Sequence, residues 1–176
     1  MKEKYRNVKN LTDLKWLNIK EVVEPEKGVK GFQFAERKGV NSIAFIGYDA
    51  ETNEYLLVNE YLPPVGHFLT RAFGGSIDKD ATPLEIARME IEEEAGYDVE
   101  YSDIIYLGSV FVSSMMNQYC YLFIFQANDA KRVNRTTEDP IELLSTVKRL
   151  NKNDIYDLQD WKAITIMSKY QNLLKK

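Results

Sequence analysis

Three glutamates within five residues, Glu90, Glu93 and Glu94, are the side chains of this sequence best suited to chemistry. On a helix, residues three and four positions apart are neighbours, so these carboxylates would share one arc of its surface. Bare like charges that close repel and raise one another's pKa, whereas a hard divalent cation with oxygen ligands stabilises them. The cluster therefore predicts a magnesium or manganese site. In a chain with 28% charged residues, a solvated acidic face is the alternative.

The helix that carries these glutamates is defined by its own residues. Thr82 suits the N-cap, Pro83 the first helical position, and Glu85 completes a capping box. Gly96 can adopt the left-handed conformation that ends a helix, which predicts a helix over about 83–95. Its apolar stripe, which should face the core, comprises Leu84, Ala87, Ile91 and Ala95.

A pair of glycines, Gly74 and Gly75, precedes the helix. Residues without a Cβ let the backbone approach a ligand closely, and an exposed carbonyl there adds an oxygen ligand. We therefore expect the Gly74 carbonyl to contribute to the metal site.

The segment 74–96 resembles the Nudix box, G-x5-E-x7-R-E-U-x-E-E-x-G-U with U aliphatic. The matching residues, with the same spacing, are Gly75, Glu90, Ile91, Glu93, Glu94 and Gly96. The stretch LLVNEYLPPVG before the box is similar to LLVxQYRPPVG of the ADP-sugar (ADP-ribose) pyrophosphatase branch, and GGSID replaces its AGLID. The resemblance implies an α/β class fold, a Nudix-type α/β/α sandwich with a mixed β-sheet and a short N-terminal strand layer.

The resemblance also implies an activity, the metal-dependent hydrolysis of the diphosphate linkage in a nucleoside diphosphate joined to another group. ADP-ribose or another nucleotide sugar is the leading substrate, and Mg2+ or Mn2+ the expected cofactor. Glu90 and Glu94 should hold the metal, and Glu93 should hold it or orient the attacking water. The Gly74 carbonyl would complete the metal shell, and Gly75 would lie against the substrate.

Several positions depart from the family pattern. Ala81 replaces the first glutamate of the box, and Met89 replaces its arginine. The branch commonly uses a glutamate in a loop after the box to activate water, and Gln118 falls at that place here. Glutamine cannot be a general base. The attacking water must then be deprotonated by a box carboxylate such as Glu93, by an acid of the TTEDPIE loop (Glu138 or Asp139), or through coordination to the metal, which lowers the pKa of water.

Two further changes affect the expected substrate pocket. Leu62 replaces the arginine of YRPP, and Arg71 replaces a glutamate, which puts a positive charge beside the expected diphosphate position. A surface position at the end of a strand is the alternative for Arg71. Gln118 is a candidate for substrate binding, and Tyr61, Phe32 or Phe34 could stack on a nucleobase, although each also suits a core.

Composition limits the other possibilities. A length of 176 residues with 44% apolar residues fits one folded domain, and a net charge of −4 with a pI near 5.2 argues against a general nucleic-acid surface. No run of eighteen apolar residues and no secretory signal are visible, so we expect a cytoplasmic protein that does not bind membranes. Cys120 is expected to be a buried thiol, and His67 a loop residue rather than a catalytic one.

Residues 1–38 are predicted to form the N-terminal strand layer and residues 39–176 the hydrolase domain. Expected strands are 17–24, 29–34, 41–48, 55–61, 68–73, 104–113, 119–126 and 141–149, with a terminal helix over 161–174. The family resemblance implies a homodimer formed through the N-terminal layer.

The sequence is compatible with two other functions. A nucleotide-binding or sensor domain that keeps the fold without hydrolysis is favoured by Ala81, Met89 and Gln118, whereas the intact Glu90, Glu93 and Glu94 favour catalysis. An enzyme that cleaves nucleoside triphosphates is the weaker alternative, because such relatives tend to be shorter and lack the YxPPVG segment.

Overall fold

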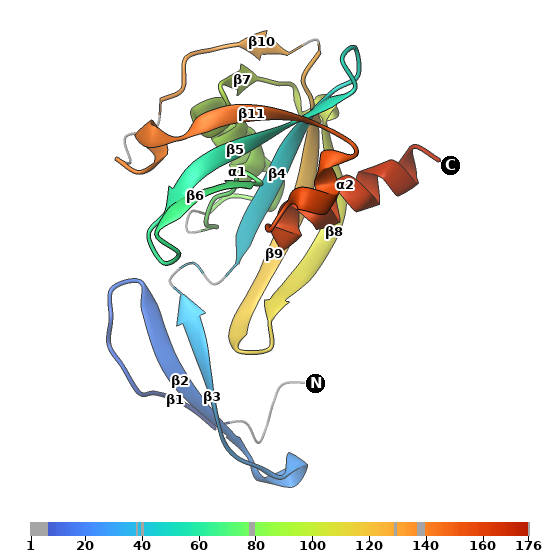
Figure 1. Cartoon of the computed structure of the whole chain (residues 1–176). Coiled ribbons are helices and arrows are strands. Elements are labelled where there is room, and N and C mark those ends of the chain that lie inside the picture. Colours follow the sequence, from blue (N-terminus) through green and yellow to red (C-terminus); the bar gives the residue numbers. More distant parts are fainter. Residues whose placement is uncertain are drawn as a thin grey trace.

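The computed structural model of the chain describes residues 7–37, 39, 41–77, 80–128, 130–136 and 140–175. Within them, a mixed sheet has the strand order β1-β2-β3-β9-β4-β5-β11, with β6 beside β5 and β8 beside β9. Helices α1 and α2 cover opposite faces of its central strands (Figure 1). The strands are β1 (Asn7–Asn10), β2 (Leu17–Glu24), β3 (Val29–Arg37), β4 (Ser42–Asp49), β5 (Glu54–Leu62), β6 (His67–Arg71), β7 (Tyr97–Asp98), β8 (Ile104–Ser113), β9 (Met116–Gln126), β10 (Lys131–Arg132) and β11 (Thr146–Asn151), and the helices are α1 (Pro83–Glu90) and α2 (Trp161–Leu173).

Strand β4 lies at the centre of the sheet and is buried along its whole length. Its side chains alternate, so that Phe45 packs toward α1 while Ala44 and Ile46 pack toward α2. The neighbouring β9 runs parallel to β4, and the chain between them passes through α1. A strand buried on both faces needs an apolar run rather than alternation, as the segment IAFIG provides.

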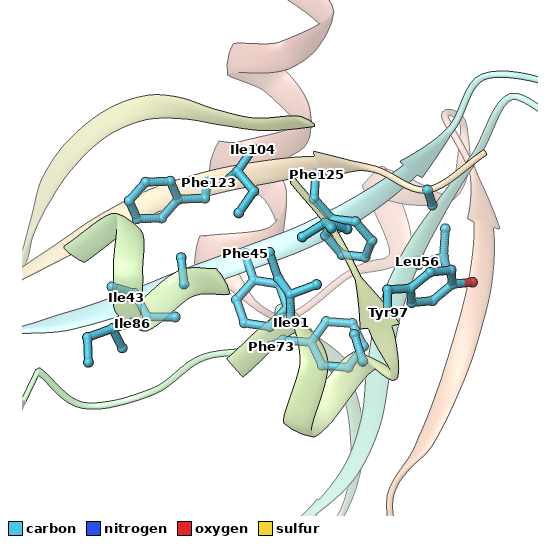
Figure 2. Close-up of a cluster of buried hydrophobic side chains, with 14 of the residues drawn as sticks. Ile43, Phe45, Leu56, Phe73, Ile86, Ile91, Tyr97, Ile104, Phe123 and Phe125 are labelled. Atoms are coloured by element: carbon cyan, nitrogen blue, oxygen red, sulfur yellow. The ribbon is translucent and has the colours of Figure 1, made fainter. Parts of the chain in front are cut away.

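The core between the sheet and α1 is rich in aromatic rings, as Figure 2 shows. Phe45 and Phe73 stack with their ring centroids 5.1 Å apart, and Phe125 meets Phe45 edge-on at 6.2 Å. Ile86 and Ile91 pack onto this cluster from α1 and the turn after it. This packing fixes the position of the acidic helix relative to the sheet.

Strands β1, β2 and β3 form an antiparallel layer that projects from one end of the molecule (Figure 1). The layer joins the main sheet at Ala35, which pairs with Met116 and donates its N–H to the carbonyl of Met115 at 2.8 Å. Several of its apolar side chains are exposed, among them Trp16 at 61% and Phe32 at 43%. The β2–β3 hairpin itself follows the predicted ranges closely.

The C-terminal region differs from the prediction at one place. The expected strand 141–149 begins later, because Glu142–Leu144 form a short 3-10 helix, η4, and β11 starts at Thr146. A short pair between β7 and β10 was not predicted, since two-residue strands carry no periodicity. Cys120 is buried, as expected. Among the described residues, no helix has the length and apolar character needed to cross a membrane.

Candidate functional site

A pocket of about 450 Å³ lies between the acidic helix, the glycine pair, the ends of β3 and β6, and η4. Its walls carry both signs of charge, with cations and carboxylates brought together from distant parts of the chain. The charged side chains that line it are Arg37, Glu60, Arg71, Glu90, Glu94, Arg135, Glu142 and Lys162.

The glycine pair forms one wall of this pocket. The segment runs beside β4, since Phe45 donates its N–H to the Phe73 carbonyl at 3.0 Å and Ile43 donates to the Gly75 carbonyl at 2.9 Å. Because carbonyls alternate in direction along an extended chain, the Gly74 carbonyl faces away from β4. A Cβ on Gly74 would lie 2.7 Å from the Ile43 carbonyl oxygen, so that glycine is needed for close contact with the strand.

Gly75 makes a different close contact. A Cβ at this position would lie 2.2 Å from Oε1 of Glu90 and 2.6 Å from its Cδ. The missing side chain therefore leaves the space that the Glu90 carboxylate occupies. This contact explains why a box glycine and a box glutamate fifteen positions apart belong to the same site.

The acidic helix begins as predicted. The Thr82 hydroxyl accepts the N–H of Glu85, and the Glu85 carboxylate accepts the N–H of Thr82, so the capping box is complete. Arg88 anchors the other side of the helix through bonds to Asp98 at 3.0 Å and to the Val99 carbonyl at 2.9 Å.

The helix ends at Gly96 as predicted, but the conformation of its last turn differs from the prediction. After Glu90 the chain continues as a π-helix, η2 (Ile91–Ala95), and ends at Gly96, whose φ is 75° and whose N–H bonds the Ile91 carbonyl five residues back. A π turn advances each residue by a smaller angle than an α turn, which places Glu94 more nearly above Glu90 and rotates Glu93 away from it. Accordingly, Glu90 and Glu94 line the pocket and Glu93 is not among its lining residues.

Glu94 has an unusual electrostatic environment. Burial against the pocket wall raises its pKa to about 8, with further contributions from the charges of Glu90 and Glu142. The Gly74 N–H, 3.4 Å from Oε2, and the charge of Arg71 act in the opposite direction. A bound cation would reduce the electrostatic repulsion among these crowded carboxylates.

The donor set fits a magnesium ion that is completed by its substrate. Among the described residues, no three His, Cys, Asp or Glu side chains form a group that could hold a metal by itself. Magnesium, however, usually binds through one or two carboxylates together with water and substrate phosphates. Glu90, Glu94 and the Gly74 carbonyl are the oxygens that this pocket offers to such an ion.

Cations line the same pocket as the carboxylates. Arg71 forms an ion pair with Glu60 at 2.5 Å, and both side chains are partly exposed. Arg37, at the end of β3, donates to the Ser76 hydroxyl at 2.5 Å. Lys162 in α2 adds a third positive charge to the lining. Of these, Arg71 was a predicted site residue, whereas Arg37 and Lys162 have no local motif and are positioned only by the fold.

The segment after β9 supplies an acid that the sequence did not predict as a site residue. The Arg135 guanidinium donates to the carbonyls of Glu142 and Ser145 and to the Ser145 hydroxyl, which fixes η4 against the pocket. Glu142 then lies close enough to raise the pKa of Glu94. It is the last residue of the TTEDPIE stretch, where Glu138 and Asp139 were the predicted candidates; those two lie outside the described residues.

Two predicted substrate-binding residues do not line the pocket. Gln118 lies within β9, is 5% exposed and contributes nothing to the lining, because the loop expected there is a tight hairpin turn. Tyr61 packs edge-on against Phe68 in the β5–β6 hairpin, with ring centroids 5.6 Å apart. Met89, by contrast, lines the pocket where the family places an arginine.

Comparison with known proteins supports the fold. No protein-family model matches the chain, and no curated protein matches it in sequence. Among solved structures, the chain is similar to a crystal structure described as an ADP compounds hydrolase, with a TM-score of 0.77 and 15% identity over 96% of this chain and 92% of that one. The Nudix-type α/β fold predicted from the sequence is thereby confirmed.

Proposed function

We propose that this protein hydrolyses the diphosphate linkage of a nucleoside diphosphate joined to a second group, with ADP-ribose or another nucleotide sugar as the leading substrate. The observation that carries the proposal is the convergence of Glu90, Glu94 and the glycine pair on a pocket lined with arginines. The similarity to an ADP compounds hydrolase supports the same substrate class.

Glu90, Glu94 and the Gly74 carbonyl would hold Mg2+ or Mn2+, with Glu93 a further candidate from the sequence. When bound, the ion would neutralise diphosphate charge and make water a better nucleophile. Because Glu94 holds a proton more tightly than an ordinary carboxyl, binding of the ion should release a proton.

The protein's own side chains would perform the remaining work. Arg71 and Arg37 are placed to bind diphosphate oxygens, since guanidinium groups form paired hydrogen bonds with phosphate. Glu142, an acid from outside the helix, is our candidate to accept a proton from the attacking water. Glu142 would take the role that the family pattern gives to the residue at position 118. Gln118 cannot fill that role, because its amide cannot accept a proton and it does not line the pocket.

A nucleotide-binding domain without hydrolytic activity is the second candidate. Met89 favours it, because an apolar side chain lines the pocket at the position where the family pattern has an arginine. Both candidates predict nucleotide binding, and only the first predicts new products.

Product analysis separates the two candidates. Purified protein would be incubated with ADP-ribose, other nucleotide sugars, dinucleotides and triphosphates, with Mg2+ or Mn2+, and the products resolved by chromatography. The wild type should release AMP from ADP-ribose, Glu94→Gln should be slower by orders of magnitude, and Glu92→Gln should be unaffected because Glu92 is exposed and absent from the pocket lining. Tight nucleotide binding without any product would support the sensor domain instead.

We also propose a homodimer formed through β1–β3, as the family resemblance implies. Leu14 and Trp16 are each 61% exposed, and burial of such side chains would favour association. The oligomeric state and the cellular location are not needed for the proposed chemistry.

A further inference from the structure

A second cavity, of about 270 Å³, shares Arg135 with the lining of the candidate active site. It is enclosed by the end of the π-helix, the β7–β10 pair and the edge formed by β5 and β11. Leu56 and Val147 provide apolar surface, and Arg132, Arg135 and Arg149 provide the charge. Among the described residues, no Asp or Glu lines this cavity.

Arg135 brings a guanidinium charge to the lining of this cavity. Its Nη atoms donate to neutral oxygens, the carbonyls of Glu142 and Ser145 and the Ser145 hydroxyl, at 2.7 to 3.2 Å. Its Nε is buried and has no hydrogen-bond partner in the described part of the chain. Within the described ranges the Nη atoms bond only to neutral oxygens, so no direct ion pair balances the positive charge of this guanidinium there.

Arg132 adds a second uncompensated charge at the mouth of the cavity. Its guanidinium lies over the ring of Tyr97, 5.4 Å from the ring centroid, and β10 is held beside β7 by the pairing of these two residues. In the described ranges, no carboxylate lies within ion-pair distance of Arg132. The aromatic contact therefore orients the side chain without neutralising it.

Arg149 contributes differently. Its Nη1 pairs with Asp49 at 2.9 Å and with Glu54 at 3.1 Å, so its charge is balanced by carboxylates outside the cavity. Arg149 is therefore a fixed part of the cavity lining, and the electrostatic attraction for an anion comes from Arg132 and Arg135.

We propose that this cavity is an anion site for a phosphate group, either inorganic phosphate or a phosphomonoester. Arginines suit this ligand because their planar donors match paired phosphate oxygens. The volume exceeds that of a phosphate ion, and the surface of Leu56 and Val147 can accept an organic part. The site does not depend on the hydrolytic activity. An anion bound there would contact Arg135, which holds the segment that carries Glu142. Its binding would therefore affect the position of Glu142 in the candidate active site.

Residue-resolved NMR tests the proposal on the full chain without divalent ions. Titration with inorganic phosphate, and separately with AMP, would be followed through the Arg135 Nε–H signal and the backbone amides of Gly96 and Val133, which border the second cavity. The amides of Gly74 and Gly75 report on the first pocket in the same spectra. The test variant is Arg132→Gln, and the matched control is Lys131→Gln, which removes an equal charge one residue away from the lining.

The proposal requires that at least one ligand shifts the second-cavity signals along a saturating curve, and that Arg132→Gln weakens this binding about tenfold while Lys131→Gln changes it less than twofold. A response to both ligands identifies the phosphate group as the shared determinant, and a response to AMP alone identifies a phosphomonoester. Shifts confined to Gly74 and Gly75, equal weakening in both variants, or no saturation with either ligand would each overturn it. Loss of hydrolysis in the wild type would leave these outcomes unchanged, so failure of the enzyme proposal is distinguishable.

Discussion

Replacing Gly75 by alanine should slow the proposed hydrolysis strongly without unfolding the protein. The new Cβ would lie 2.2 Å from Oε1 of Glu90, and ordinary van der Waals contact begins near 3.4 Å, so the carboxylate must move by about 1 Å. Gly75 does not have a positive φ, so alanine fits its backbone, and the obstructing atoms belong to a flexible side chain rather than to the main chain. The cost should therefore fall on the position of Glu90 and not on folding.

The size of the effect follows from the sensitivity of catalytic sites to geometry. A misplacement of about 1 Å can cost roughly a hundredfold in rate, equivalent to about 2.7 kcal/mol of transition-state stabilisation. We expect kcat/KM for ADP-ribose to fall by about that factor in Gly75→Ala. The free energy of unfolding, measured with urea, should change by less than about 1 kcal/mol.

Two other glycines provide matched controls. Gly74→Ala would place its Cβ 2.7 Å from a backbone oxygen of β4 that cannot move freely, so it should lower stability by about 1–3 kcal/mol. Gly31→Ala, whose nearest contact would be 3.4 Å from the Glu21 carboxylate in the N-terminal layer, should alter neither property. Activity of Gly75→Ala within threefold of wild type, or a stability loss equal to that of Gly74→Ala, would show that Gly75 is not needed to position Glu90.

Three further predictions concern other parts of the molecule. Burial raises the pKa of Glu94 to about 8, so ionisation of this carboxyl should destabilise the metal-free fold progressively between its unfolded pKa, near 4.5, and pH 8. In EDTA, Glu94→Gln should therefore have a higher melting temperature than wild type at pH 8 and the same melting temperature at pH 4. An equal difference at both pH values would contradict this. The hydrogen bond from Arg149 lowers the pKa of Asp49, so this ion pair stabilises the fold above the unfolded pKa of an aspartate, and its contribution is lost in acid. Asp49→Asn should lower the free energy of unfolding, measured with urea, by about 1–2 kcal/mol at pH 7, and the difference from wild type should narrow below pH 4. A difference that does not narrow would exclude the ion pair as its source. If β1–β3 form a dimer interface, Trp16→Ser should shift the mass measured by light scattering toward the monomer, whereas a wild-type monomer at high concentration would end the dimer proposal.

The sequence predicted what depends on local chemistry. Thr82, Pro83 and Glu85 define the helix start through contacts within one turn, and Gly96 defines its end through its own backbone conformation. The apolar pattern predicted the positions of the central strands, because side chains of β4 and its neighbours must pack into the cores on both faces of the sheet.

The remaining features depend on tertiary contacts that no local pattern encodes. The π turn after Glu90 changes which acids face the pocket, and it removes Glu93 from the arc that regular helical spacing predicts. Gln118 was placed in a loop by analogy with the family, but the chain forms a continuous hairpin there. Arg37 and Glu142 reach the pocket from segments more than one hundred residues apart in the sequence, which only the folded sheet brings together.

Mn2+ binding, measured by electron paramagnetic resonance, shows whether Glu90 and Glu94 hold a divalent ion against a diphosphate. The wild type, Glu94→Gln and the exposed control Glu92→Gln would be titrated with and without a non-hydrolysable methylene analogue of ADP-ribose. We predict that the analogue strengthens Mn2+ binding to the wild type and to Glu92→Gln, and that Glu94→Gln loses at least tenfold in affinity. Equal Mn2+ affinity in all three proteins, or no binding even with the analogue present, would show that Glu94 does not hold the ion.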